Sequence, residues 1–163
     1  MVISDFNLIC LGQPKPHFFR PKGVFFEVVD SDEGAYNPEW QSLKKESGVW
    51  YSIFPVDDAG TRTYDDEFFD IGKKSEETFS VVVIEKYKKT LLEIVEYFLE
   101  ESPIHRIIIM LWLDGDEKQP GICCPLGHFR ELLYNNNLLF GVIYVIYREN
   151  AENTHNTGDG SMC

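Results

Sequence analysis

The chain has 163 residues, of which 44% are apolar and 14% aromatic, so its composition excludes a wholly disordered protein and favours one globular domain. Its 27 acidic and 15 basic residues give a net charge of −12, which opposes binding to nucleic acid or an anionic membrane and favours a basic partner. No apolar run is long enough to span a membrane and the N-terminus lacks a secretory signal pattern, so a cytoplasmic protein is expected.

Short apolar runs predict strands in the N-terminal half. Three of them are rich in β-branched and aromatic residues and lie between Gly, Pro or Asp-Ser clusters: Phe6–Leu11, Val24–Val29 and Val49–Pro55. A further short strand is predicted from Phe68, Phe69 and Ile71, ending at Gly72. We expect these strands to form an antiparallel meander.

Acidic residues are concentrated between positions 30 and 70. This quarter of the chain holds eleven acidic and three basic residues, a net charge of −8, which is two-thirds of the total imbalance. Carboxylates speed the encounter with a basic protein and aromatic rings supply buried anchors, so the segment predicts a partner-binding surface. The alternative is a solvated loop beside two core phenylalanines. The candidate partner-binding residues are Asp57, Asp58, Tyr64, Asp65, Asp66, Glu67 and Asp70.

A helix dominates the start of the C-terminal half. Apolar residues recur at intervals of three and four from Ile84 to Leu99, which predicts an amphipathic helix over 84–101. The β-branched run before it predicts a strand over Thr78–Val83. Glu85 and Lys89 stand four residues apart in the favourable order for an ion pair on the helix surface. Ser102-Pro103 should end the helix, because a residue before proline disfavours the α conformation.

The rest of the chain predicts strand, helix and strand. Ile104–Leu113 is nearly all apolar, as in a strand buried on both faces. Pro125 is placed to open a short helix, and Asn135–Asn137 to close it, because Asn tolerates a left-handed residue there. Leu138–Tyr147 predicts a second buried strand, joined to the first by a right-handed crossover that would make the two parallel.

Together these elements predict one α+β domain with a mixed sheet. Its N-terminal part is the antiparallel meander and its C-terminal part a helix-strand-helix-strand unit. The predicted domain covers residues 1–148. Residues 149–163 are polar without an apolar period, which predicts a flexible tail.

Asp114-Gly115-Asp116-Glu117 is the sharpest candidate for chemistry. Two carboxylates at the carboxyl end of a buried strand are the type of ligand that Mg²⁺ prefers. The alternative function is therefore a magnesium-dependent, phosphate-handling enzyme that uses Asp114 and Asp116. Asp-Gly after a strand is also ordinary turn chemistry, and we assign no metal site on this pattern.

The cysteines do not indicate a further site. With no secretory signal, reduced thiols are expected for all four. Cys123, Cys124 and His128 form the nearest cluster, but the paired C-x-x-C spacing of a zinc site is absent. A Cys124–His128 nucleophile pair is disfavoured by Pro125 between them. The chain also lacks serine-hydrolase, phosphate-loop and dinucleotide motifs, so no catalytic residue and no cofactor is assigned.

Several segments of the C-terminal half form a pattern that is similar to that of a known group of proteins. The segments are Ile84-Glu85-Lys86-Tyr87, the helix through Phe98-Leu99, Ser102-Pro103-Ile104, the strand into Leu113, Phe129-Arg130-Glu131-Leu132-Leu133 and the strand Val142–Tyr147. Over residues 80–148 the chain resembles small bacterial proteins that accompany secreted polymorphic toxins and are regarded as their immunity proteins. The resemblance consists of a pattern of elements rather than an invariant motif.

This resemblance implies a non-enzymatic inhibitor that binds one toxin, often a nuclease or another basic enzyme, and blocks it in the cytoplasm. It implies no catalytic residue. A structural or regulatory interaction module is a further alternative, including a homodimer that uses an exposed strand edge.

Overall fold

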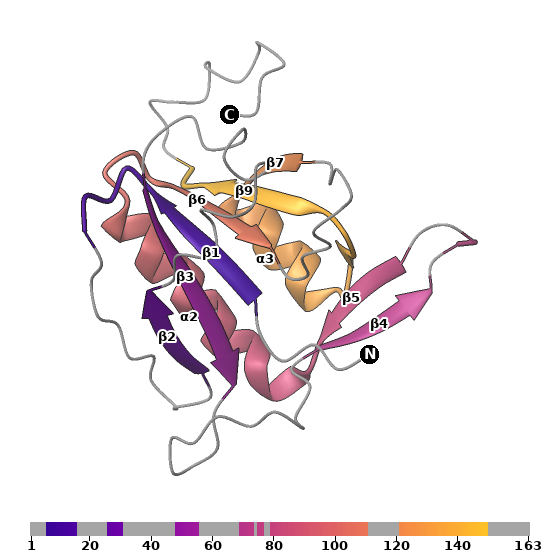
Figure 1. Ribbon diagram of the computed structural model, residues 1–163. Helices are drawn as coiled ribbons and strands as arrows, with labels where there is room; N and C mark the ends of the chain where they lie inside the picture. Colours follow the sequence, from indigo (N-terminus) through magenta and orange to yellow (C-terminus); the bar gives the residue numbers. More distant parts are fainter. Residues whose placement is uncertain are drawn as a thin grey trace.

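The computed structural model describes residues 6–15, 26–30, 48–55, 69–73, 75–76, 79–110 and 121–149. These residues form a mixed six-stranded sheet of order β2-β3-β1-β6-β9-β7, a three-stranded sheet of order β4-β5-β8, and helices α2 and α3 (Figure 1). The predicted α+β class with a mixed sheet is confirmed. The bounds are β1 Phe6–Leu11, β2 Phe26–Asp30, β3 Gly48–Pro55, β4 Phe69–Lys73, β5 Phe79–Val83, α2 Glu85–Glu101, β6 Arg106–Met110, β7 Gly121–Pro125, α3 Leu126–Tyr134, β8 Leu138–Leu139 and β9 Ile143–Tyr147.

The N-terminal strands are antiparallel, as expected, but they do not follow one another across the sheet. β3 lies between β1 and β2 and pairs with both. β1 therefore has β3 on one side and β6 on the other, which places it in the middle of the sheet. All six residues of β1 are buried, because both of its faces and both of its edges are covered.

The predicted parallel pairing of the last two long strands is wrong. β6 and β9 are antiparallel, with Ile108 opposite Val145. The parallel neighbour of β9 is β7, and α3 forms the crossover between them. The sequence Gly-Ile-Cys-Cys-Pro of β7 runs into the predicted start of the short helix at Pro125, and these five residues do not form an apolar run typical of a strand. The crossover was thus assigned to the wrong pair.

The segment predicted as one strand over Leu138–Tyr147 forms two. β8 pairs with β5 in the small sheet, whereas β9 pairs with β6 and β7 in the large one. Gly141 separates them with φ of 76°, a conformation that favours glycine. The hydroxyl of Tyr144 accepts a hydrogen bond from the N–H of Leu139 at 2.7 Å. This contact joins β8 to β9 and so connects the two sheets.

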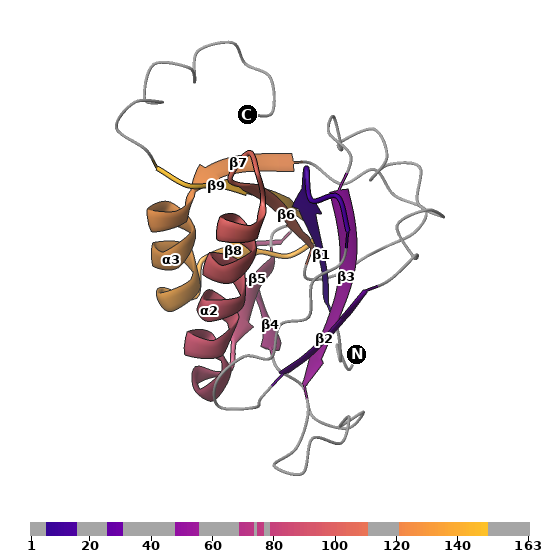
Figure 2. The same ribbon diagram turned by 90° about the vertical axis from the view of Figure 1, so that its left-hand side faces the viewer.

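Both helices cover the same face of the six-stranded sheet (Figure 2). The core between them is formed by residues such as Leu8, Ile53, Ile107 and Phe98, each with an exposed fraction of 0%. A second buried cluster lies on the other face of the same strands and includes Ile108, a residue that alternates with Ile107. No helix in the described part of the chain is long and apolar enough to cross a membrane.

The two helix ends follow the sequence expectations. Ser102 ends α2, and its buried hydroxyl donates to the carbonyl of Leu11 at 2.6 Å and accepts from the N–H of Arg106 at 3.1 Å. α3 ends at Tyr134, and Asn136 adopts a left-handed φ of 58° just after it. The prediction that the asparagines close this helix is confirmed.

Candidate partner-binding surface

Asp70 is the only predicted partner-binding residue in the described part of the chain. It lies on β4, and its side chain is exposed. The other six, Asp57, Asp58, Tyr64, Asp65, Asp66 and Glu67, lie outside the described residues, and their grouping stays a prediction. Asp114, Asp116 and Glu117 also lie outside them, so the magnesium-enzyme alternative rests on the sequence pattern alone.

The small sheet that carries Asp70 has one apolar and one more polar face. Val81 and Val83 of β5 are buried in the core, and residues between them belong to the opposite face because side chains alternate along a strand. Asp70 stands opposite Val82, and Gly72 opposite Ser80, so these four residues share the second face. On this face Asp70 is exposed, Gly72 and Val82 are half-buried and Ser80 is buried, so the carboxylate is presented to solvent rather than toward the core.

Gly72 fits the close approach of β4 to β5. The Ser80 hydroxyl donates to the carbonyl of Gly72 at 3.3 Å. A Cβ at position 72 would lie 2.9 Å from the same hydroxyl oxygen. Because glycine has no Cβ, the Ser80 side chain can lie against the backbone of β4 at position 72, two residues from Asp70.

Among the described strands, β4 stands at the edge of the small sheet. Its one neighbour there is β5, and it lies at the periphery of the described structure, on the right in Figure 1. An edge strand presents unpaired backbone N–H and C=O groups along one side. The acidic segment that ends at residue 70 therefore leads into a strand with hydrogen-bonding capacity of its own.

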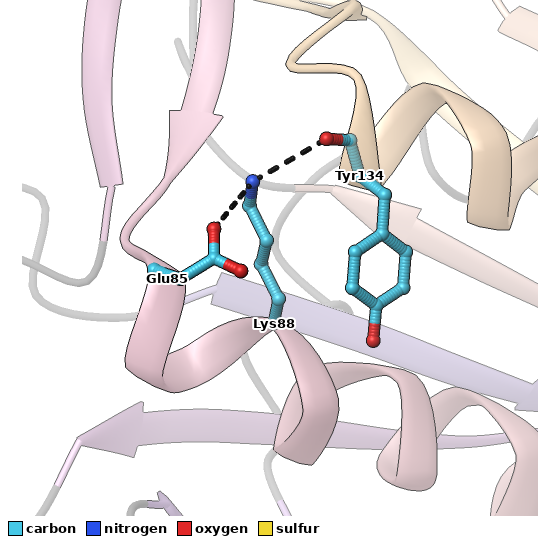
Figure 3. Close-up of polar contacts among 3 residues, drawn as sticks. All are labelled: Glu85, Lys88 and Tyr134. Carbon is cyan, nitrogen blue, oxygen red and sulfur yellow. Dashed lines mark hydrogen bonds and ion pairs between the residues drawn. The ribbon is translucent and has the colours of Figure 1, made fainter.

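A polar bridge between the helices is a feature that the sequence analysis missed. The side chain of Lys88 is 5% exposed, and its ammonium lies 3.0 Å from Oε2 of Glu85 and 3.5 Å from the carbonyl of Tyr134 (Figure 3). The expected partner of Glu85 was Lys89, which is exposed. Glu85 instead forms its ion pair with Lys88, three positions further along the helix. In the sequence, the only indication of this contact is that Lys88 directly follows Tyr87, a residue of the buried helix face.

The thiols that the structure describes are poor candidates for catalysis or metal binding. Burial raises the pKa of Cys10 to about 12, with a further contribution from the charge of Glu101, and burial raises the pKa of Cys124 to about 12. A thiolate is the reactive and metal-binding form, so both groups are inert near neutral pH. Cys123 is disulfide-bonded, which differs from the reduced state expected for all four cysteines.

The described residues contain no group of three or more His, Cys, Asp and Glu side chains able to hold a metal ion. In particular, His128 is exposed at the start of α3, whereas Cys124 is buried. The Tyr97 hydroxyl is hydrogen-bonded to Glu101, and its pKa is raised to about 12 by burial and by that carboxylate. The surroundings of Cys10, Cys124 and Tyr97 therefore favour the protonated form of each group.

Comparison of the chain with known protein families, curated proteins and solved structures finds no match.

Proposed function

We propose that this chain is a non-enzymatic immunity protein of the bacterial cytoplasm that binds and occludes a cognate basic, nuclease-like toxin. The observation that carries the proposal is the charge distribution. Residues 30–70 have a net charge of −8, and the last of them, Asp70, lies exposed on an edge strand. The pattern resemblance over residues 80–148 supports the same function.

The proposed mechanism is occlusion of the toxin cleft. Carboxylates between Asp57 and Asp70 take the positions that substrate phosphates would occupy against basic side chains. Tyr64 packs at the centre of the interface as an aromatic anchor. Complexes that combine steering with desolvated charge pairs reach very high affinity, as an inhibitor of a lethal enzyme requires.

The direct test is co-expression of the tagged chain with the product of the adjacent upstream gene. The proposal expects a stoichiometric complex and rescue of growth. The association rate should fall as ionic strength rises, because screening weakens the attraction between the acidic segment and a basic cleft. No complex and no rescue would contradict the proposal, and a salt-independent association rate would contradict its electrostatic part.

Charge reversal at Asp70 tests the location of the interface. Asp70→Lys should slow association about three- to tenfold, whereas Glu76→Lys should have a smaller effect. Glu76 is a matched control, because it is an exposed acid between β4 and β5 but lies outside the acidic segment. Equal effects of the two reversals would show that only net charge matters.

A further inference from the structure

We propose that the edge of β4 away from β5, which pairs with no other described strand, accepts an extended strand of the partner and that Asp70 faces a basic residue of that strand. This deepens the proposed function, on which the identity of the partner rests. Strand addition combines affinity from backbone hydrogen bonds with specificity from side chains at alternate positions. The directions of the backbone groups of β4, the position of Asp70 and the charge of the chain all favour such a strand.

The register of the small sheet fixes which backbone groups of β4 are free. In an antiparallel ladder, the N–H and C=O of one residue point to the same side, and successive residues alternate. The carbonyl of Phe79 accepts the N–H of Phe140 at 2.9 Å, so Phe79 points away from β4. Ser80, the next residue, points toward β4 and forms a hydrogen-bonded pair with Gly72, its opposite residue.

The alternation then extends along β4. Asp70 and Gly72 use their backbone groups on β5, so Phe69, Ile71 and Lys73 direct theirs to the side away from β5, where no other described strand pairs with them. Three alternate residues thus offer both a donor and an acceptor. This is the pattern that one added antiparallel strand would occupy.

The same geometry gives Asp70 a role in choosing the strand. In the added ladder Asp70 would stand in a non-hydrogen-bonded pair, where opposite Cα atoms lie about 4.5 Å apart and side chains approach most closely. Opposite charges at such positions stabilise a sheet and like charges destabilise it. The exposed carboxylate therefore favours a strand with Lys or Arg opposite it, in agreement with a net charge of −12.

A second copy of this chain fits the edge less well. Residues that pair across a two-fold axis must both point outward or both point inward, so Asp70 cannot stand opposite Lys73 of another β4. A ladder centred on Ile71 would place Asp70 opposite Gly72 instead. Two copies also repel each other through their net charge. A basic partner is the occupant that the charges favour.

The test uses an eight-residue peptide of alternating Lys and Val, blocked at both ends, and residue-resolved amide hydrogen exchange by NMR. Binding at the edge should slow exchange at Ile71 and Lys73 at least tenfold. The amide of Gly72, already bonded to β5, should change little. A second probe of the same sequence, N-methylated at every residue, has no N–H donor on either side and should give no protection.

Lys73→Pro and Lys73→Ala separate hydrogen bonding from charge. Both variants remove one positive charge, so attraction alone predicts that both bind the basic peptide more tightly than the wild type. Proline also removes an outward N–H, and at the end of an edge strand it is tolerated. We expect Lys73→Pro to bind about two- to tenfold more weakly than Lys73→Ala. Retained protection of Gly72 would show that β4 still pairs with β5.

Each outcome decides the proposal. Absence of protection at Ile71, equal binding by the two variants, or equal binding of the two peptides would overturn it. A wild-type dimer in sedimentation that Lys73→Pro dissociates would show that a second copy occupies the edge. Growth rescue without protection of the β4 edge would support the immunity function and contradict strand addition. Protection of the edge without growth rescue would support strand addition and contradict the immunity function.

Discussion

Lys88 is a charged residue in the middle of the apolar face of α2. Its neighbours Tyr87 and Leu91 are buried in the core, and its methylene stem fills the space between α2 and the end of α3. Long basic side chains bury the stem and keep the charged end in a polar contact. Here that contact is the exposed carboxylate of Glu85 and one of the last carbonyls of α3, that of Tyr134.

Lys88→Ala should lower the free energy of unfolding by about 1–3 kcal/mol, because it leaves a carbonyl of α3 without its donor and removes a buried stem. Lys89→Ala, one position on, removes the same charge from an exposed site. It should change the free energy by less than about 0.5 kcal/mol. Urea denaturation of the two variants measures the difference, and equal midpoints would show that the bridge contributes nothing.

Stability should fall as the pH rises from 9 toward 12. The thiols of Cys10 and Cys124 have an ordinary pKa of 9.0, raised by burial to about 12. Above pH 9 the unfolded chain loses these protons while the folded chain keeps them, so the free energy of unfolding declines. A Cys10→Ala, Cys124→Ala variant should show a shallower decline, measured by denaturation at several pH values. A decline of unchanged slope would mean that these thiols already titrate in the folded protein.

At the level of elements, local patterns predicted most strands and both described helices. β1 matched its prediction residue for residue, and α2 began one residue later than expected, because β-branched runs and a continuous apolar stripe are determined by nearby residues. The pairing of strands, in contrast, depends on residues that are distant in the sequence. Nothing near Cys123 and Cys124 showed that β7 would lie beside β9, and Gly141 did not show that its two flanks belong to different sheets.

The end of α3 gives a prediction about turn residues. Asn136 holds a φ of 58°, and its side-chain oxygen is buried without a hydrogen-bond partner. Asn136→Gly relieves both costs and should raise the free energy of unfolding by up to about 1 kcal/mol. Asn135 has a φ of −92°, so Asn135→Gly adds only unfolded-state entropy and should lower it by about 0.5–1 kcal/mol. If the thermal midpoints of Asn136→Gly and Asn135→Gly shifted in the same direction, the left-handed conformation of Asn136 would not be the cause of the difference.

At the level of the whole molecule, the net charge of −12 disfavours the compact state through self-repulsion. Raising NaCl from about 0.01 M to 0.15 M shortens the screening length from about 30 Å to 8 Å, so the thermal midpoint should rise. A Glu76→Gln, Glu131→Gln, Glu149→Gln variant, which brings the charge to −9 through exposed positions, should show a smaller rise in calorimetry. A midpoint that falls with salt would mean that favourable ion pairs outweigh repulsion.

The candidate surface could be predicted from the sequence only in part. The acidic segment is visible in the composition, and the structure shows that Asp70 at its end is exposed, whereas its partner-binding role stays a prediction. The edge position of β4 could not be predicted, because it depends on the pairing of β5 with both β4 and β8 in the folded protein. The register with Phe79 and Phe140, which fixes the free backbone groups, likewise arises only after folding.

The central position of β1 has a consequence for synthesis on the ribosome. β1 can pair with β3 as soon as residue 55 has emerged, but its other edge belongs to β6, which ends at residue 110. The carbonyl of Leu11 must also wait for Ser102, 91 residues later. Pairing over such distances is slow. We therefore expect the nascent chain to expose an unpaired apolar strand edge from the emergence of residue 55 until that of residue 110, the interval in which chaperones would bind it.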